Sequence, residues 1–139
     1  MARVETSGID EVIEDLKKLG ELTGDGADRI LLAGAEEVSK ARKKAAEMHG
    51  HRVTGAMINN IGYPKTPKTV NGVRQIEVYS KGKDKKGVRN AEKEFVLHYG
   101  TSSKPGTHWI DDAEKKAEAP AKAAMEAEYD ELLKEKGLI

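Results

Sequence analysis

The sequence predicts an α+β fold in one domain, residues 1–139, on three observations. Apolar residues recur at helical spacing in four segments, whereas strand-like alternation occurs only in the middle of the chain. A chain of 139 residues is long enough for a single modest core. Hydrophobic residues make up only 37% of the sequence and charged residues 35%, so this core should be thin. We expect two N-terminal helices, a small antiparallel sheet, a short helix and a long C-terminal helix.

The two N-terminal helices are predicted at residues 9–20 and 27–48. The first has apolar residues at steps of three and four. The second would be about 33 Å long, and Asp25 is a candidate for its N-cap. Small residues let a partner element come close, so we expect this helix to pack tightly inside the domain; a seam between subunits is the less favoured alternative. The seam of the second helix alternates steps of four and three and consists mostly of small residues: Ala27, Leu31, Gly34, Val38, Ala41, Ala45 and Met48.

Two extended segments are predicted after these helices, at residues 57–63 and 73–80. The second alternates apolar and polar residues and is the best strand candidate in the chain. The simplest pairing of the two is an antiparallel hairpin. Prolines, glycines and lysines fill the segments at about 64–72 and 81–89, which we expect to be mobile, exposed loops.

A short helix is predicted at residues 90–99, and a tight corner follows it. Ala91, Phe95 and Tyr99 are spaced by four and would form the apolar face of this helix. The corner contains the only Phe and the only Trp of the chain beside a Gly-Thr step and a Pro-Gly step. We expect it to hold two helices at a fixed angle, through Phe95, Tyr99, Gly100, Thr101, Trp109 and Ile110.

The C-terminal helix is predicted to start at Thr107 or Asp111 and to end near Lys136. It is acidic, and its apolar positions recur at steps of three and four. Pro120 lies inside it, and proline removes a backbone hydrogen bond, so we expect a kink or a division there.

Composition and charge exclude several classes of site. The chain has no cysteine, which excludes disulfides, thiolate catalysis and cysteine-bound metal. No apolar run approaches the ~18 residues that span a bilayer, and residues 1–7 lack an apolar signal core, so we expect synthesis in the cytoplasm. The net charge is −3 over residues 1–49, +7 over 50–90 and −4 over 110–139. Such an uneven distribution could serve packing between identical copies or contact with a polyanion.

Enzyme chemistry has little support in this sequence. No motif of a nucleophile with its base is present, and residues 82–87 have the glycine spacing of a phosphate loop without its Lys-Ser/Thr ending. His49 and His51 are the only candidates for a metal pair, and a polar cluster at a helix end is the favoured interpretation. His98 is interpreted as a packing or hydrogen-bonding residue. We expect no catalytic residue, no metal and no cofactor.

The basic middle segment could contact DNA or an acidic protein surface. Phosphate contacts need only lysine and arginine side chains. Because these residues are scattered over two loops, a solvated loop or an acidic neighbour is favoured over DNA. The candidate residues are Lys65, Lys68, Lys81, Lys83, Lys85, Lys86 and Arg89.

Two short motifs resemble a family of tailed-phage virion proteins. Residues 54–61, with Thr54, Gly55, Met57 and Ile61, are similar to its Thr-Gly-x-Leu-x-x-Ser-Ile element. Residues 96–101 resemble its aromatic-Gly-Thr corner, and residues 109–113 stand where it has Pro-Phe-Leu-x-Pro-Ala. The family is the tail-completion or head–tail joining group, often labelled minor tail component.

This resemblance implies a noncatalytic structural protein of the virion. Copies would form a ring at the neck that joins the tail tube to the head, beside terminator and stopper proteins, with DNA passing through the lumen. The protein would assemble in the host cytoplasm and then reside in the virion. A tail terminator that caps tube growth is the alternative within this class, and a small DNA-binding protein using residues 52–89 is the alternative outside it.

The chain departs from the family pattern at several positions. Trp109 replaces Phe and Met57 replaces Leu, and both changes keep an apolar anchor. His98 stands where Glu is usual, Asn60 replaces Ser and Asp112 replaces Pro. The changes at His98 and Asp112 alter the charge at the corner, so the family's partner contacts there do not carry over directly.

Overall fold

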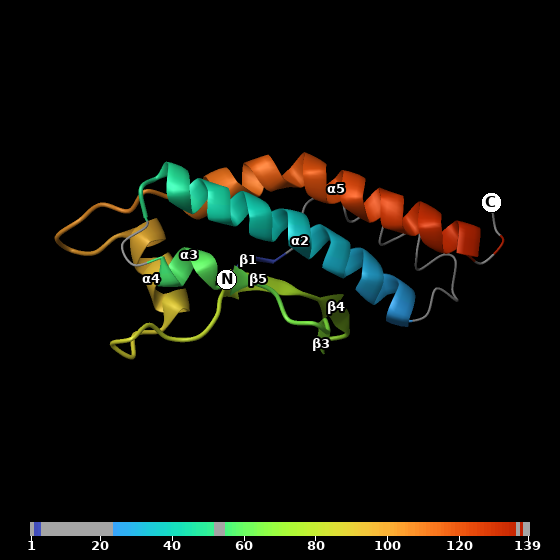
Figure 1. The fold of residues 1–139 in the computed structure, drawn as a ribbon, viewed down its shortest axis with the longest axis horizontal. Coiled ribbons are helices and arrows are strands. Elements are labelled where there is room, and N and C mark those ends of the chain that lie inside the picture. Colours follow the sequence, from blue (N-terminus) through green and yellow to red (C-terminus); the bar gives the residue numbers. More distant parts are fainter. Residues whose placement is uncertain (1, 4–23, 52–54, 136, 138–139) are drawn as a thin grey trace.

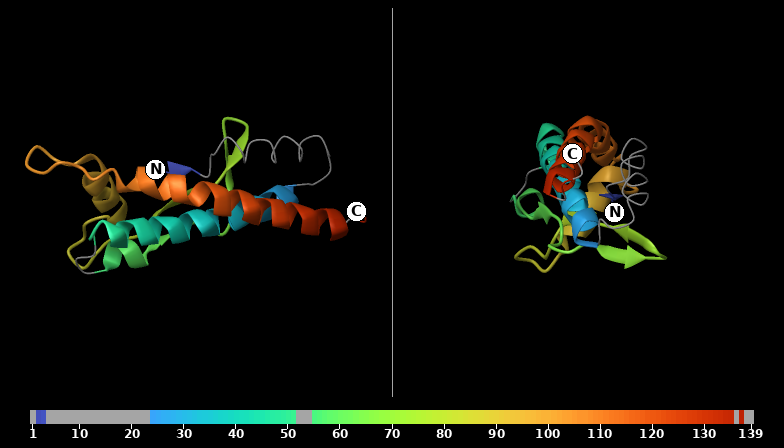
Figure 2. Two further views of the ribbon diagram at one scale, coloured as in Figure 1. Left: turned by 90° about the horizontal axis from the view of Figure 1, so that it is seen from above. Right: turned by 90° about the vertical axis from the view of Figure 1, so that its right-hand side faces the viewer.

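Two long antiparallel helices form the frame of the molecule. The computed structural model describes residues 2–3, 24–51, 55–135 and 137, so the predicted helix at 9–20 and Thr54 lie outside the described residues. Helix α2 (Gly24–Met48) and helix α5 (Trp109–Glu135) lie side by side along most of their lengths (Figures 1 and 2). The remaining described elements cover one side of this pair (Figure 1). The architecture is α+β, as the sequence predicts.

Small residues are buried on both long helices. They include Gly34 and Ala45 of the predicted seam of α2, and Ala113, Ala117 and Ala121 of α5. Helix α2 packs mainly on α5 of the same chain, and four of the seven seam residues (Leu31, Gly34, Val38 and Ala45) are buried, which agrees with the favoured prediction of packing inside the domain. Met48, at the end of that seam, is 65% exposed and does not belong to the core.

The ends of both long helices differ from the prediction. Helix α2 begins at Gly24, so Asp25 lies in its first turn and not at the position before it. Helix α5 begins at Trp109 and continues through Pro120 to Glu135. Of the two predicted alternatives, a kink or a division at this proline, the division is therefore wrong. Proline costs the helix one backbone hydrogen bond there, and the buried stripe of alanines on both sides of Pro120 holds α5 to α2 through that point. None of the described helices has an apolar stretch sufficient to span a bilayer.

A small sheet is centred on strand β5 (Glu77–Ser80). It pairs antiparallel with β1 (Ala2–Arg3) and with β2 (Ile61–Gly62), where Ile61 lies opposite Ser80. This confirms the antiparallel pairing of the two predicted segments over a short length. Strands β3 (Lys68–Val70) and β4 (Val73–Gln75) form a separate hairpin that projects from the body of the molecule (Figure 2).

Two short helices complete the layer beneath the long pair. Helix α3 (Ala56–Asn59) occupies residues predicted as extended, and it starts after Gly55, whose φ of 85° favours glycine. Helix α4 (Asn90–Tyr99) has the predicted bounds, but the face that it buries is not the predicted one. It buries Asn90, Glu94 and His98, whereas Phe95 and Tyr99 of the predicted apolar face are exposed. The reason is the buried charge of α2 described below, which requires polar partners.

Candidate functional site

The corner between α4 and α5 is closed by backbone contacts. The N–H groups of Thr107 and His108 donate to the carbonyls of Leu97 and His98, at 3.0 and 3.1 Å. These are carbonyls of the last turn of α4, which has no further helical turn to supply donors. The chain thus leaves α4, forms an exposed loop at residues 101–105 and returns against the end of the same helix.

Two glycines permit this return. A Cβ atom at Gly106 would lie 2.2 Å from the His98 carbonyl oxygen, and one at Gly100 would lie 2.3 Å from the Gly106 nitrogen. Gly100 also has a φ of 87°, which side chains rarely adopt. The Gly100-Thr101 and Pro105-Gly106 steps therefore lie against each other. We call this contact of residues 97–101 with residues 105–108 the glycine clasp.

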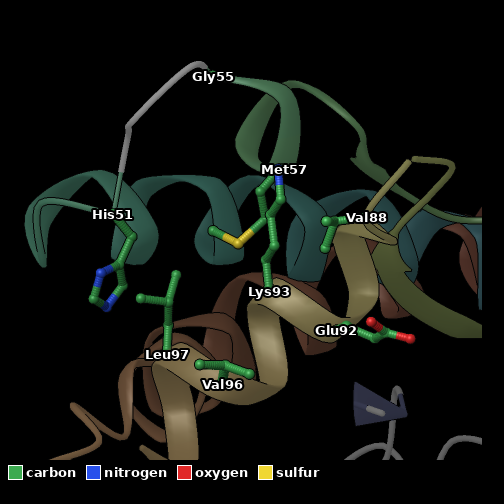
Figure 3. A pocket seen from close by; sticks show the side chains of 8 residues that line it. All are labelled: His51, Gly55, Met57, Val88, Glu92, Lys93, Val96 and Leu97. Carbon is green, nitrogen blue, oxygen red and sulfur yellow. The ribbon is translucent and has the colours of Figure 1, made fainter. Parts of the chain in front are cut away.

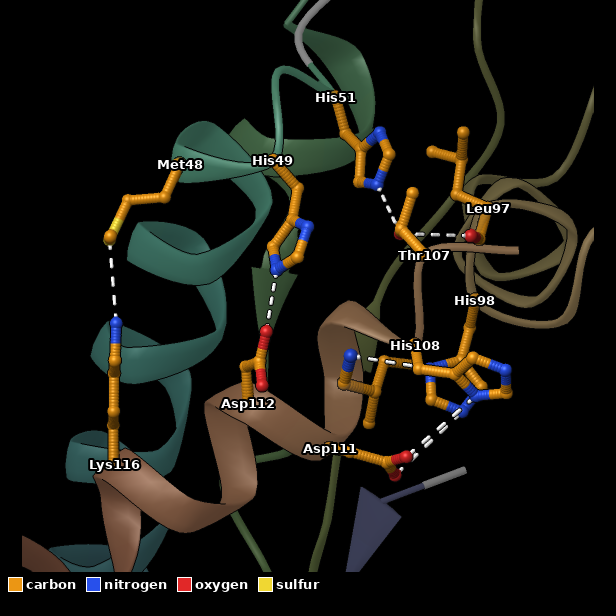
Figure 4. A network of polar contacts seen from close by, with 11 residues as sticks. Met48, His49, His51, Leu97, His98, Thr107, His108, Asp111, Asp112 and Lys116 are labelled. Atoms are coloured by element: carbon orange, nitrogen blue, oxygen red, sulfur yellow. Dashed lines mark hydrogen bonds and ion pairs between the residues drawn. The ribbon is translucent and has the colours of Figure 1, made fainter. Parts of the chain in front are cut away.

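All four histidines of the chain surround this clasp (Figure 4). His49 Nε2 lies 2.7 Å from Asp112 Oδ2, in the first turn of α5. His51 Nε2 lies 2.8 Å from Thr107 Oγ1, and that hydroxyl donates to the Leu97 carbonyl. Since the hydroxyl has only one proton, His51 is the donor in its contact with Thr107. The two histidines considered as a metal pair therefore each bind a side chain of the corner.

His98 acts as a cap for α5. Its Nδ1 accepts a hydrogen bond from the Ile110 N–H at 3.2 Å, one of the donors that lack a partner within the helix. An acceptor at Nδ1 places the proton of the neutral ring on Nε2, which faces Asp111 Oδ1 at 3.8 Å. Burial lowers the pKa of His98, although Asp111 opposes this shift. Burial also lowers the pKa of His51, with a smaller contribution from His49.

These shifts predict that the protein loses stability in mild acid. A histidine with a lowered folded-state pKa contributes stability that is complete above the unfolded pKa of about 6.5 and is lost as the pH falls through the folded value. Protonation of His98 also removes its acceptor for the Ile110 N–H. We expect the melting temperature to be constant from about pH 8 to 7 and to fall below about pH 6.5.

The control is His98→Asn, whose side-chain oxygen can accept the same hydrogen bond and does not titrate near neutral pH. The fall in melting temperature between pH 6.5 and 5 should be smaller in this variant than in the wild type. An identical profile for both proteins would contradict the assignment of this titration to His98.

Among the residues that the structure describes, one group of side chains has ligand atoms close enough together to bind a metal ion. His98, His108 and Asp111 offer ligand atoms within 4.8 Å of one another. A metal on His98 Nε2 would require the proton to move to Nδ1, which would break the cap of α5. The arrangement therefore fits a structural network better than a metal centre.

A buried ion pair lies beneath α4. Arg42 of α2 is 1% exposed; its Nη1 donates to the Val78 carbonyl at 2.9 Å and lies 3.4 Å from Glu94 Oε2. Burial raises the pKa of Glu94, and Arg42 and the Ser80 N–H oppose that rise. Burial also lowers the pKa of Arg42, again against the attraction of Glu94. The pair joins α2, β5 and α4, and it explains why α4 turns its polar side inward.

The opposite side of α4 is exposed and largely apolar. Phe95, Val96 and Tyr99 are 50%, 49% and 62% exposed, and the rings of Phe95 and Tyr99 are 5.1 Å apart. Together with Glu92, at helical spacing, these residues form the outer face of α4. Contiguous exposed apolar surface of this kind often marks an interaction site.

A pocket of about 390 Å³ opens beside this face (Figure 3). It lies between α3 and α4, and Val96 belongs both to the pocket and to the outer face of α4. Most of its lining side chains are apolar or present an aliphatic chain: His51, Gly55, Met57, Val88, Glu92, Lys93, Val96 and Leu97.

The basic residues predicted to face a partner divide between two places. Lys65 lies shortly before the β3–β4 hairpin, and Lys68 is the first residue of β3 and pairs with Glu77. The others lie in the loop between β5 and α4, at a distance from that hairpin along the molecule (Figure 1). The loop is built around Asp84, which accepts hydrogen bonds from the N–H groups of Lys86 and Val88. A continuous basic path for DNA would need both places, and the structure does not bring them together.

Comparison with known families identifies the chain. Residues 10–101 match the family described as "Bacteriophage HK97-gp10, putative tail-component". The chain belongs to this HK97-gp10-like family. It is therefore a bacteriophage tail component and a part of the virion. No curated protein and no solved structure matches the chain significantly.

The two segments that resemble the family, residues 54–61 and 96–101, both contribute to the pocket, through Gly55 and Met57 and through Val96 and Leu97. Gly55 starts α3 and lines the pocket, and Met57 and Ile61 are buried in the core. Gly100 and Thr101 belong to the glycine clasp, where the Thr101 N–H donates to the Lys104 carbonyl. Trp109 is fully buried and its ring lies edge-on to His51, at 6.0 Å. Phe95 and Tyr99 are exposed, and the ring of Tyr99 lies edge-on to His98, at 4.5 Å, so Tyr99 contacts the corner from outside while Phe95 does not belong to its buried part.

Sequence reasoning missed the ion pair and the pocket in this phage tail component. Arg42 interrupts the apolar positions of α2, which was a signal that a buried partner would be needed. Asn90, Glu94 and His98 are spaced by four, and this polar stripe was the matching signal on α4. The pocket depends on the packing of α3 against α4, for which the sequence holds no local signal.

Proposed function

We propose that this tail component acts at the neck of the particle, as a tail-completion protein that joins the tail tube to the head. Copies would form a ring through which DNA passes, in contact with tail-tube, terminator and stopper proteins. The observation that carries the proposal is the presence of both family motifs, Thr-Gly and the Gly-Thr corner, in a chain of the HK97-gp10-like family.

The geometry supports a structural role. The histidines of the corner are engaged in holding backbone and side chains: His98 caps α5, His51 holds Thr107 and His49 pairs with Asp112. A chain whose reactive groups stabilise its own fold is better suited to assembly than to catalysis, and we propose that it is not an enzyme. The exposed outer face of α4 supports the same view, because an assembled protein must bury such a surface.

Deletion of the gene from its parent phage or prophage tests the proposal, with electron microscopy of the induced lysate as the measurement. DNA-filled heads beside finished, unattached tails are the expected result. Complementation with the wild-type chain should restore joined particles. Tails of uncontrolled length would instead identify a terminator, and normal infectious particles would overturn both roles.

A further inference from the structure

The outer face of α4 and the loop before it form one surface that combines apolar and positive groups. Phe95, Val96 and Tyr99 supply exposed apolar side chains. The preceding loop, residues 81–89, carries five basic side chains and one acidic one, Asp84. Lys93 lies 2.6 Å from Asp84 and lowers the pKa of that carboxyl group, so the acidic group of the loop is already neutralised. The loop is therefore left with an excess of positive charge beside an aromatic protrusion.

The exposed side of α5 has the complementary properties. Ala119, Ala123 and Ala127 are spaced by four and all are exposed. Exposed helix positions usually carry long polar side chains, so these three alanines leave a flat stripe on the outer side of the helix. Glu126 and Asp130 lie on the same side. Lys122, one turn before, lies 4.0 Å from Glu126, and α5 as a whole carries nine acidic and four basic residues, so the helix keeps an excess of negative charge. A helix with a shallow alanine stripe and negative charge can accept protruding aromatic rings flanked by lysines. We call this surface the outer face of α5 (Ala119, Ala123, Glu126, Ala127 and Asp130).

We propose that the outer face of α4 in one copy docks on the outer face of α5 in a second copy of this chain. The proposal rests on the assembly role proposed above and specifies the surface on which the ring closes. Phe95 and Tyr99 would lie on the alanine stripe, and the 81–89 loop would face Glu126 and Asp130. Aromatic residues in the centre of an interface supply most of its binding energy, with charged residues at the rim setting the register.

The two faces belong to different elements, so the contact is head-to-tail. Each copy uses one face for the neighbour on one side and the other face for the neighbour on the other side. A contact of this type generates a closed ring when the rotation between copies closes, and it leaves no copy with an uncovered α4 except in an open chain. A symmetric contact between two α4 faces would instead end at a dimer.

Cysteine cross-linking tests this contact directly, because the chain contains no native cysteine. Chains with Val96→Cys alone, which keeps both aromatic rings of the face, and with Ala123→Cys alone are mixed and oxidised, so that any product joins two different chains. The expected result is a cross-linked dimer from the mixture. The doubly substituted chain should give a ladder of multimers. Val73→Cys is the matched control, since Val73 is similarly exposed on the separate hairpin, and its mixture with Ala123→Cys should give no product.

The same variants introduced into the phage separate this proposal from the proposed function. Particles that contain the protein and show the cross-link between positions 96 and 123 support both. Particles that contain the protein but show no such cross-link overturn the docking surface and leave the assembly role intact. If the protein is absent from particles, the assembly role is wrong. Cross-linking of the mixed purified chains is then the measurement that tests the docking surface. Cross-linked dimers from Val96→Cys alone would indicate the symmetric contact and overturn the proposal.

Discussion

Arg42→Met is expected to lower the free energy of unfolding by about 3–5 kcal/mol, because it leaves Glu94 buried and without its cation. Glu94 is 4% exposed, and its pKa is already raised by burial in the presence of Arg42. Loss of the guanidinium also removes the donor to the Val78 carbonyl. Chemical denaturation monitored by circular dichroism measures the change, and the variant should unfold at a clearly lower denaturant concentration.

The double variant Arg42→Met/Glu94→Leu distinguishes the cost of an unpaired charge from the loss of side-chain volume. A hydrophobic pair of similar size is often as stable as a buried ion pair, so the double variant should recover most of the lost stability. Arg29→Met is the matched control, because Arg29 pairs with Glu128 and Glu135 at the surface and should matter far less. If the double variant is no more stable than Arg42→Met, the charge argument is wrong.

Gly106→Ala is expected to destabilise the protein by about 3 kcal/mol or more, since the new methyl group would overlap backbone atoms that cannot move independently. The Cβ would lie 2.2 Å from the His98 carbonyl oxygen and 2.4 Å from the Tyr99 carbonyl carbon. Relief requires separation of the two strands of the glycine clasp, which breaks the hydrogen bonds of Thr107 and His108 to the end of α4. Thermal unfolding is the appropriate measurement.

Two other glycines provide controls for this variant. Gly62 has no atom within 4 Å of its Cβ position and no positive φ, so Gly62→Ala should be close to neutral. Gly72 also has open space but a φ of 76°, so Gly72→Ala isolates the cost of the backbone conformation. Equal melting temperatures for Gly106→Ala and Gly62→Ala would show that the clasp is not closed in solution.

The sequence predicted those parts of the fold that depend on a repeated apolar spacing. The seam of α2 and the stripe of Ala113, Ala117, Ala121 and Met125 on α5 recur over many turns, and such a pattern is robust to local exceptions. The division expected at Pro120 was wrong because burial on both sides of the proline outweighs one missing hydrogen bond. Residues 57–59 were predicted as extended because their apolar side chains have no period in so short a segment.

The candidate site was less accessible to sequence reasoning, and α4 shows why. Periodicity assumes that the apolar side of a helix is the buried one, and for α4 it selected Ala91, Phe95 and Tyr99. The assumption fails where a neighbouring element buries a charge, because the helix must then present polar groups to it. Arg42 and Glu94 are 52 positions apart, and only the folded chain shows that they meet.

Because of the glycine clasp, the stability of the domain depends little on which side chains one surface loop carries. The loop at residues 101–105 is fixed at its base by backbone hydrogen bonds and by the approach of two glycines, neither of which depends on the side chains at its tip. Ser102 and Lys104 are exposed there. Substitutions at the tip should therefore have little cost to folding, which makes this loop a suitable point for inserting a peptide tag.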